Sequence, residues 1–165
     1  FYIQKRVGRN YREFGCIKFR TMYKDADDLL PNLLEKYPLM RKEFEKDFKL
    51  RQDPRITKLG RFLRRSSLDE LPQFFNVLKG EMSVVGPRPI VSNEIIKYSL
   101  FMEEVISVRP GLTGLWQVSG RNNLSYIKRV ELDLLYARNR NFLLDLEIII
   151  LTLGVLLFPM DRGAF

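Results

Sequence analysis

The chain has 165 residues, 45% of them hydrophobic, so it is long and apolar enough to bury the core of one domain. Its formal net charge of +8 points to an anionic partner such as nucleic acid, a phospholipid surface or a phosphorylated small molecule. One cysteine and no histidine exclude an internal disulfide, a cysteine-based metal site and the usual general base. Any catalysis must therefore use carboxylates, lysine, arginine or a metal held by oxygen.

The first 22 residues predict a β-hairpin, with strands over residues 1–4 and 14–20 and a turn at residues 8–10. Alternation in the second strand puts Lys18 and Arg20 on one face, and Ile17 and Phe19 on the other. The face with the two cations is either an anion-binding surface or an ordinary solvated strand face.

Residues 25–48 predict either a helical hairpin or a helix broken at Tyr37-Pro38, to which we assign no chemistry. A basic amphipathic segment over residues 53–65 follows, with no acid between its cations and an apolar stripe beside them. Such a segment is typical of a membrane surface rich in anionic lipid, although nucleic-acid backbones attract the same pattern. Its cations are Arg55, Lys58, Arg61, Arg64 and Arg65.

Two adjacent carboxylates, Asp69 and Glu70, stand just after these cations, where a further helix is predicted to begin. The N-terminus of a helix favours ionised carboxylates, and the adjacent Arg64 and Arg65 can bind an anion brought to the same place. This arrangement suits phosphate chemistry. The helix is expected to bury one apolar stripe and to close at Gly80, the stripe being Leu71, Phe74, Phe75 and Leu78.

The same residues have a purely structural interpretation, because Ser67 and Glu70 are spaced as a capping box. Pro72 weakens it, since a helix capped by Ser67 would lose a backbone hydrogen bond at that proline, whereas a helix capped by Asp69 would not. Either way the two acids stay at the start of the helix.

A short strand over residues 82–85 leads into Gly86-Pro87-Arg88-Pro89, which either presents Arg88 at a fixed place or is a plain rigid turn. Helices are predicted over residues 92–107, 125–138 and 142–158, with a glycine-rich loop over residues 109–122.

The apolar run 148–158 is shorter than the roughly 20 residues that cross a bilayer as a helix, so we expect it to be buried or to lie in the membrane interface. We expect an α+β fold, mostly helical with a small β-hairpin, short strands and amphipathic helices along the membrane.

Several short motifs run in one order over nearly the whole chain. They are Lys18-Phe19-Arg20-Thr21-Met22, Asp53-Pro54-Arg55-Ile56-Thr57, Ser67-Leu68-Asp69-Glu70-Leu71-Pro72-Gln73, Phe75-Asn76-Val77-Leu78-Lys79-Gly80, Gly86-Pro87-Arg88-Pro89, Arg109-Pro110-Gly111-Leu112-Thr113-Gly114, Val118-Ser119-Gly120-Arg121-Asn122 and Asp161-Arg162-Gly163-Ala164-Phe165. Together they resemble the bacterial sugar transferases, or monotopic phosphoglycosyl transferases, which start lipid-linked glycan assembly at the inner membrane. The combination is specific and favours the functional interpretation of Asp69 and Glu70 over the capping box.

The resemblance implies that residues 1–165 form a single catalytic domain. Such a domain would transfer a hexose 1-phosphate, galactose first or glucose, from a UDP-sugar to undecaprenyl phosphate for O-antigen, capsule or exopolysaccharide assembly. The products would be undecaprenyl diphosphate sugar and UMP. Asp69 would be the nucleophile that carries a covalent phosphosugar, and Glu70 its helper. The pair would hold Mg²⁺, which prefers hard oxygen ligands.

The resemblance also assigns substrate-binding residues. Lys18, Arg20, Arg64 and Arg88 would neutralise the diphosphate as charge develops on the leaving UMP, while Gln73 and Arg121 would bind substrate. Family members carry a hydrophobic re-entrant helix just before the position of Phe1. We therefore expect a fragment of a longer protein at the cytoplasmic face of the bacterial inner membrane, and larger members of the family can be homodimers.

Two other interpretations remain open at this point. A basic nucleic-acid-binding module would explain the net charge, but the sequence carries no recognised binding motif of that kind. A membrane-associated scaffold with a dead site would keep lipid binding without turnover.

Overall fold

The computed structural model describes residues 1–47, 50, 52–120 and 124–157. The chain divides into two compact units: Phe1–Phe19 with the chain from Glu70 onward make the first, and Arg20–Asp69 makes the second. The described residues are mostly helical, with two small two-stranded sheets, which confirms the expected α+β class.

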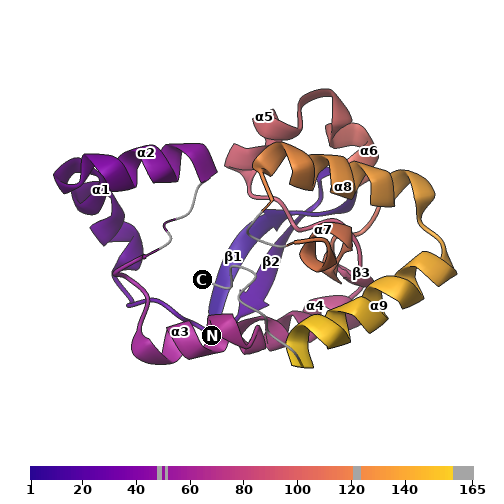
Figure 1. Cartoon of the computed structure of the whole chain (residues 1–165), viewed down its shortest axis with the longest axis horizontal. Coiled ribbons are helices and arrows are strands. Elements are labelled where there is room, and N and C mark those ends of the chain that lie inside the picture. The colour runs from indigo at the N-terminus through magenta and orange to yellow at the C-terminus, as the bar shows by residue number, and fades with distance from the viewer. Residues whose placement is uncertain (48–49, 51, 121–123, 158–165) are drawn as a thin grey trace. The chain divides into compact units, whose positions relative to one another are not determined.

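The hairpin at the start of the first unit consists of β1 (Tyr2–Val7) and β2 (Glu13–Lys18), which pair antiparallel (Figure 1). Tyr2 lies opposite Lys18, and Val7 opposite Glu13. A short 3-10 turn, Arg9–Tyr11, joins them. The prediction that the second strand reaches Arg20 is wrong. Because the strand ends at Lys18, Arg20 does not share a strand face with it.

The second sheet is a parallel pair, β3 (Ser83–Val85) and β4 (Gly111–Thr113). The sequence indicated β3 but not β4, which lies inside the predicted glycine-rich loop. The two segments approach very closely, since a Cβ at Gly111 would lie 2.1 Å from the backbone nitrogen of Gly86. Glycine is therefore needed there for space, and the approach fixes the backbone that leads into Arg88.

Helices of the first unit lie above and below the hairpin in the view of Figure 1. The predicted helix over residues 92–107 is instead four short pieces: η3 (Ser92–Glu94), α5 (Ile95–Tyr98), η4 (Ser99–Phe101) and α6 (Met102–Ile106). The later helices are α7 (Leu115–Val118), α8 (Tyr126–Asn139) and α9 (Phe142–Leu157). The largest buried cluster lies between the hairpin and helices α5, α6 and α8, and consists of Val7, Ile90, Tyr98, Met102, Val105, Ile106, Val130 and Leu134.

The segment after Asp69 begins as a 3-10 helix, η2 (Leu68–Gln73), and continues as α4 (Phe74–Leu78). Gly80, with φ of +77°, follows its end, as expected. The predicted burial of its apolar stripe is wrong: Leu71, Phe74, Phe75 and Leu78 are 49%, 50%, 58% and 83% exposed. Hydrophobic periodicity reports that one face differs from the other, and does not say whether protein or lipid covers that face.

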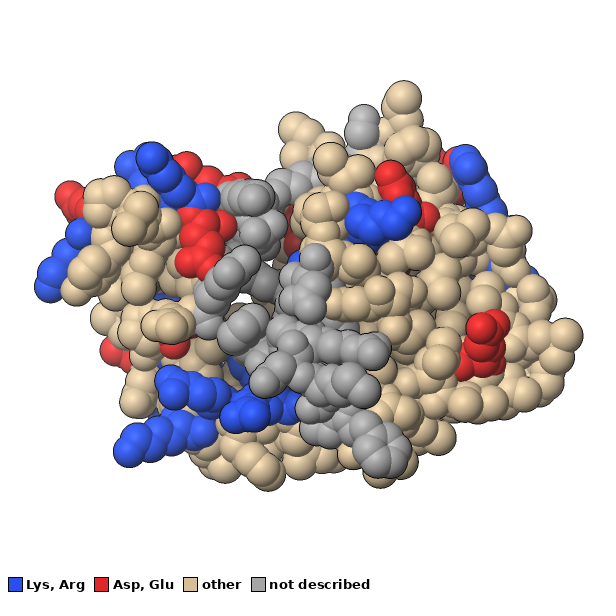
Figure 2. All heavy atoms as spheres, in the orientation of Figure 1, with Lys and Arg blue, Asp and Glu red and all other residues tan. Residues whose placement is uncertain are grey.

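Helix α9 exposes a second apolar surface, and the face over it in Figure 2 is almost entirely uncharged. Its exposed side chains include Phe142, Leu143, Ile150, Leu153 and Leu157. Among the described residues, no helix combines the length and the apolar character that a membrane span requires.

The second unit contains α1 (Ala26–Lys36), α2 (Pro38–Asp47) and α3 (Lys58–Arg65), with the predicted break at Tyr37. Lys and Arg side chains gather over α3 in Figure 2. Arg55 was expected among these cations but is buried. Its guanidinium forms two hydrogen bonds with the Asp53 carboxylate, at 2.9 and 2.6 Å, and donates to the Ala26 carbonyl. The Asp53-Pro54-Arg55 motif is therefore a structural clamp in this unit.

Candidate active site

Lys18 and Glu70 form an ion pair between the end of β2 and the first turn of η2. The Lys18 Nζ donates to Glu70 Oε1 at 2.7 Å, and both side chains are partly exposed. Burial alone would raise the pKa of Glu70, but the charge and hydrogen bond of Lys18, together with the charge of Arg88, lower it below its usual value. Glu70 is therefore an anion at neutral pH, paired with Lys18 and stabilised at longer range by the charge of Arg88.

Two buried amides, Gln73 and Asn76, follow Glu70 in the chain. Gln73 is only 2% exposed, and its side chain helps to lower the pKa of Glu70. Asn76 is fully buried. Its Oδ1 accepts from the Ile17 backbone at 3.1 Å, and its Nδ2 donates to the Gly15 carbonyl at 2.8 Å. Asn76 thus fixes α4 against β2, next to Lys18.

Arg88 follows β3 and reaches the same part of the first unit. Burial acts to lower its pKa, but the negative charge of Glu94 and the neighbouring Tyr98 and Glu70 raise it. Its guanidinium carbon lies 6.0 Å from the centre of the Trp116 ring, which is the outer limit of a cation–π contact. Arg88 is therefore permanently charged, and its positive charge interacts favourably with the negative charge of Glu70.

Arg6 on β1 fixes the backbone next to Arg88. It is 7% exposed, and its Nη1 donates to the Pro89 carbonyl at 2.8 Å. Glu94, 6% exposed, lies 4.0 Å from Arg6 Nη1 and accepts from the Val91 backbone at 3.2 Å. A buried pair of this kind holds the Arg88 loop between the hairpin and η3, since its charges are satisfied by one another and by the backbone.

Asp133 on α8 is a buried carboxyl near Arg88. It is 1% exposed and accepts a hydrogen bond from the Tyr98 hydroxyl at 3.0 Å. Burial raises the pKa of Asp133 to about 7, although the Tyr98 hydroxyl, the backbone N–H of Arg88 and the charge of Arg88 act in the opposite direction. The pKa of this carboxyl is therefore near neutrality, and its Oδ2 holds the Tyr98 hydroxyl.

The remaining predicted site residues belong to the second unit or to undescribed parts. Asp69 is the last residue of the second unit and is partly exposed. Arg64 Nε donates to Thr21 Oγ1 at 3.0 Å, while Arg20 is exposed. Arg121 lies outside the described residues. The first unit thus brings together Lys18, Glu70, Gln73 and Arg88.

The position of Arg64 is determined by how α3 packs on the Thr21 segment. Thr57 caps α3 by accepting from the Gly60 backbone at 2.9 Å, and it donates to the Thr21 carbonyl at 3.2 Å. A Cβ at Gly60 would lie 1.9 Å from the Thr21 carbonyl oxygen, so only glycine allows this approach. As a result, the last turn of α3 holds Arg64 beside Thr21.

The residues present are compatible with magnesium. The described residues contain no cluster of three or more histidine, cysteine, aspartate or glutamate side chains that would enclose a metal. Magnesium does not need such a cluster, because it is usually held by one or two carboxylates together with waters and substrate phosphates. The adjacent carboxylates Asp69 and Glu70 offer that ligand type.

Sequence reasoning missed the buried groups around Arg88, namely Arg6, Glu94, Tyr98 and Asp133. One of them carried a signal: Asp133 lies three residues after Val130 and next to Leu134, so it interrupts the apolar face of the predicted helix. Arg6 carried none, because its burial depends on elements far away in the chain.

The first unit thus gathers Lys18, Glu70 and Arg88 in an α+β fold whose helices α4 and α9 carry exposed apolar side chains. The chain belongs to the bacterial sugar transferase family, whose model matches residues 1–159.

Relatives with assigned names agree with this family. The chain is 51% identical over 156 residues to the undecaprenyl-phosphate galactose phosphotransferase of Salmonella typhimurium, covering 94% of this chain and 33% of that protein. It is 42% identical over 175 residues to the undecaprenyl-phosphate glucose phosphotransferase of Komagataeibacter xylinus, covering 99% and 30%. It is 44% identical over 165 residues to the exopolysaccharide production protein ExoY of Rhizobium meliloti, covering 100% and 72%. The chain thus spans about a third of the first two relatives.

Proposed function

We propose that the chain transfers a hexose 1-phosphate, galactose or glucose, from a UDP-sugar to undecaprenyl phosphate in the assembly of a bacterial surface polysaccharide. The observation that supports this most directly is the charge arrangement at Glu70, which is held as an anion by Lys18 and Arg88 beside Asp69. The names of the Salmonella and Komagataeibacter relatives supply the acceptor and the two candidate sugars.

The proposed reaction has two half-reactions at one phosphorus. A carboxylate oxygen of Asp69 attacks the sugar-bearing phosphorus of the UDP-sugar. The bond between that phosphorus and the oxygen bridging the two phosphates breaks, and UMP leaves with the bridging oxygen. A phosphate oxygen of undecaprenyl phosphate then attacks the same phosphorus and releases the Asp69 carboxylate. Two successive displacements let one site serve a nucleotide and a lipid in turn.

The neighbouring residues have distinct roles in this scheme. Lys18 and Arg88 neutralise the diphosphate, and Glu70 orients Lys18 toward it. Arg20, Arg64, Gln73 and Arg121 are proposed to bind substrate. Magnesium, held by Asp69 and Glu70, would supply further charge neutralisation at the phosphates.

The lipid acceptor requires contact with a membrane, and the exposed apolar residues support this. Leu78 on α4 and Phe142 and Leu157 on α9 are 83%, 78% and 71% exposed. We place these surfaces in the interfacial layer at the cytoplasmic face of the inner membrane. A homodimer would be a further way to cover apolar surface, and analytical ultracentrifugation in detergent would detect it.

The first test replaces the proposed nucleophile. We expect Asp69→Asn to lower UMP release from UDP-galactose and UDP-glucose by at least about 10³-fold, because an amide oxygen is a poor nucleophile. The matched control is Asp28→Asn, an exposed acid in the first turn of α1, which should keep full activity.

A second readout examines the intermediate itself. With UDP-sugar and no acceptor, mass spectrometry should find a hexose phosphate on the peptide containing Asp69, and adding undecaprenyl phosphate should remove it. Normal turnover by Asp69→Asn, or an adduct on another residue, would contradict the proposed nucleophile.

A further inference from the structure

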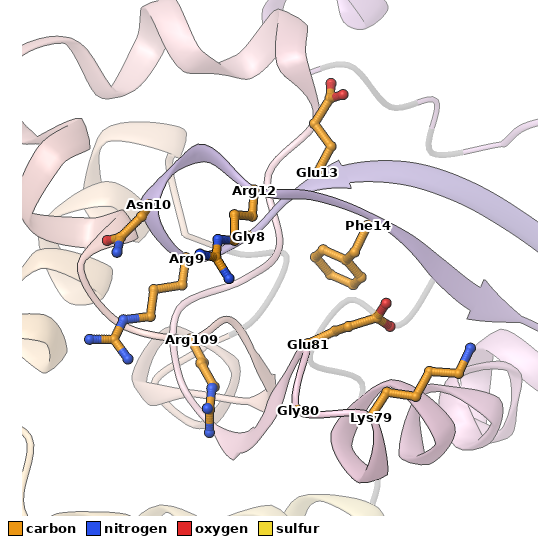
Figure 3. Close-up of a pocket in the computed structure, with 10 residues that line it drawn as sticks. All are labelled: Gly8, Arg9, Asn10, Arg12, Glu13, Phe14, Lys79, Gly80, Glu81 and Arg109. Atoms are coloured by element: carbon orange, nitrogen blue, oxygen red, sulfur yellow. The ribbon is translucent and has the colours of Figure 1, made fainter.

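A hollow of about 580 Å³ opens at the turn end of the hairpin in the first unit (Figure 3). Three segments line it: the turn between β1 and β2, the end of α4, and the loop before β4. Its volume is within the usual range for pockets that bind small molecules. Its charged lining residues are Arg9, Arg12, Glu13, Lys79, Glu81 and Arg109.

The charges around this hollow are unbalanced. Glu13 pairs with Lys5 at 2.6 Å, whereas Glu81 accepts a hydrogen bond from the neutral Asn76 Nδ2 at 2.6 Å and keeps its negative charge, so four cations face one uncompensated carboxylate. Within the described part of the chain, no carboxylate forms an ion pair with any of the four cations, which are Arg9, Arg12, Lys79 and Arg109. Four cations around one concave surface attract an anion carrying more than one charge.

The turn that carries two of these cations is held in place. Asn10 and Tyr11 have positive φ angles of 54° and 60°, which cost energy and persist only where the surroundings fix them. The Tyr11 hydroxyl donates to Glu103 at 2.8 Å, and the Gly8 backbone donates to the Arg12 carbonyl at 2.9 Å. A held turn presents its arginines to a ligand with less entropy to lose.

The hollow is separate from the candidate active site. Strand β2 runs from Glu13 at the hollow to Lys18 at the Glu70 ion pair, five residues further along. At about 3.3 Å per residue, the two sites are roughly 17 Å apart along the strand. Helix α4 likewise lies between Glu70 at one site and Lys79 at the other.

We propose that this hollow is a second, non-catalytic binding site for a phosphate-bearing ligand, either a free polyphosphate or the phosphate headgroup of an anionic lipid. The cavity and its four cations favour such a ligand whether or not the chain is a transferase.

The test is a site-resolved titration of this 19.5 kDa chain with inorganic pyrophosphate, followed by ¹H–¹⁵N NMR. We expect saturable shifts of the Gly8 and Gly80 amides, both of which line the hollow. The double variant Arg12→Gln/Arg109→Gln should weaken this binding by about tenfold or more. The matched control is Arg140→Gln, an exposed arginine of the same unit away from the hollow, which should bind as the wild type does.

A vesicle experiment distinguishes the two ligand sources. If the ligand is a lipid headgroup, phosphatidylglycerol vesicles will retain the wild type more strongly than the double variant, and phosphatidylcholine vesicles will not discriminate. If it is a free polyphosphate, only the pyrophosphate titration will separate the two proteins. Lys79→Gln, on a different segment, provides a second variant with the same expected direction. Equal behaviour of wild type and variants in both experiments would overturn the proposal.

Discussion

Asp133 is a carboxyl that the fold buries beside Arg88 and Tyr98. Its raised pKa of about 7 means that the folded state binds a proton more tightly than the unfolded state, whose aspartate has a pKa of about 3.8. Its contribution to the free energy of unfolding therefore declines as pH rises from about 4 to about 7, and is constant beyond. The upper limit of this decline is about 4 kcal/mol, at about 1.4 kcal/mol per pKa unit.

Replacing Asp133 by asparagine should remove this pH dependence. The asparagine keeps an acceptor for the Tyr98 hydroxyl but cannot ionise. As pH rises from 5 to 8, the free energy of unfolding of Asp133→Asn should therefore increase relative to that of the wild type. Urea unfolding at the two pH values measures the change. A constant difference between the two proteins over this range would show that the Asp133 carboxyl does not titrate as described.

The pKa of Glu70 is shifted in the opposite direction to that of Asp133, because the charge of Lys18 lowers it. Removing the ammonium in Lys18→Met should raise the pKa of Glu70, because burial then meets less opposition from nearby positive charge. A ¹³C NMR titration of the Glu70 carboxyl measures this directly, and Lys18→Arg should keep the pKa low. An unchanged Glu70 pKa in Lys18→Met would mean that Arg88 alone holds the anion.

This pair should matter more for chemistry than for stability. Its stabilising contribution is present above the ordinary glutamate pKa of 4.5 and is lost as pH falls below it, since the folded pKa is the lower one. Because both side chains are partly exposed, the stabilisation should be below about 1 kcal/mol.

At the scale of single elements, α4 shows why an apolar stripe is ambiguous. The positions of Leu71, Phe74, Phe75 and Leu78 follow from the sequence, but their exposure depends on which other elements pack nearby. If α4 lies in a membrane interface, Leu78→Asp should weaken binding to phosphatidylglycerol vesicles by about tenfold or more, through lost apolar contact and charge repulsion.

Leu100 provides the matched control for this prediction. Leu100 is a leucine of the same unit that lies on η4, and its side chain is 89% exposed, compared with 83% for Leu78. Leu100→Asp should leave vesicle binding almost unchanged, and both variants should unfold at nearly the wild-type temperature. Equal losses in the two variants would indicate a general effect of added negative charge.

The parallel β3–β4 pair makes a prediction about packing. Gly111→Ala should destabilise the fold by more than about 2 kcal/mol, because the added Cβ would meet the Gly86 backbone and force the two strands apart. Gly154→Ala is the control, since a Cβ there meets nothing within 4 Å. In the interior of α9, that change should be neutral or stabilising by up to about 1 kcal/mol. Thermal unfolding compares the two, and a neutral Gly111→Ala would contradict the close approach.

Strong local patterns were predictable, and long-range pairings were not. The hairpin, the break at Tyr37 and the last two helices follow from periodicity and turn residues. Strand β4 does not, because a three-residue strand beginning with glycine has weak intrinsic preference and exists only through its partner. Likewise, Lys18 and Arg88 follow from motifs, whereas the burial of Arg6 and Glu94 depends on tertiary packing.

At the scale of the whole molecule, the boundary between the two units in the sequence lies between Asp69 and Glu70, the two residues proposed for catalysis. Asp69 ends the second unit, and Glu70 begins the return to the first. The first unit contributes Lys18 and Arg88, and the second contains Arg64 held by Thr21. Motifs that are scattered along the sequence therefore fall in both units.

Asn76 has a consequence for engineering of this enzyme family. The oxygen of its carboxamide accepts from the Ile17 backbone, and the nitrogen donates to the Gly15 carbonyl and to the Glu81 side chain. The position therefore needs one acceptor and two N–H donors on the same planar group. Neither aspartate nor leucine offers both, so this position should tolerate almost no change in a mutational library. Attempts to alter sugar preference should therefore diversify the surrounding loops and leave this amide untouched.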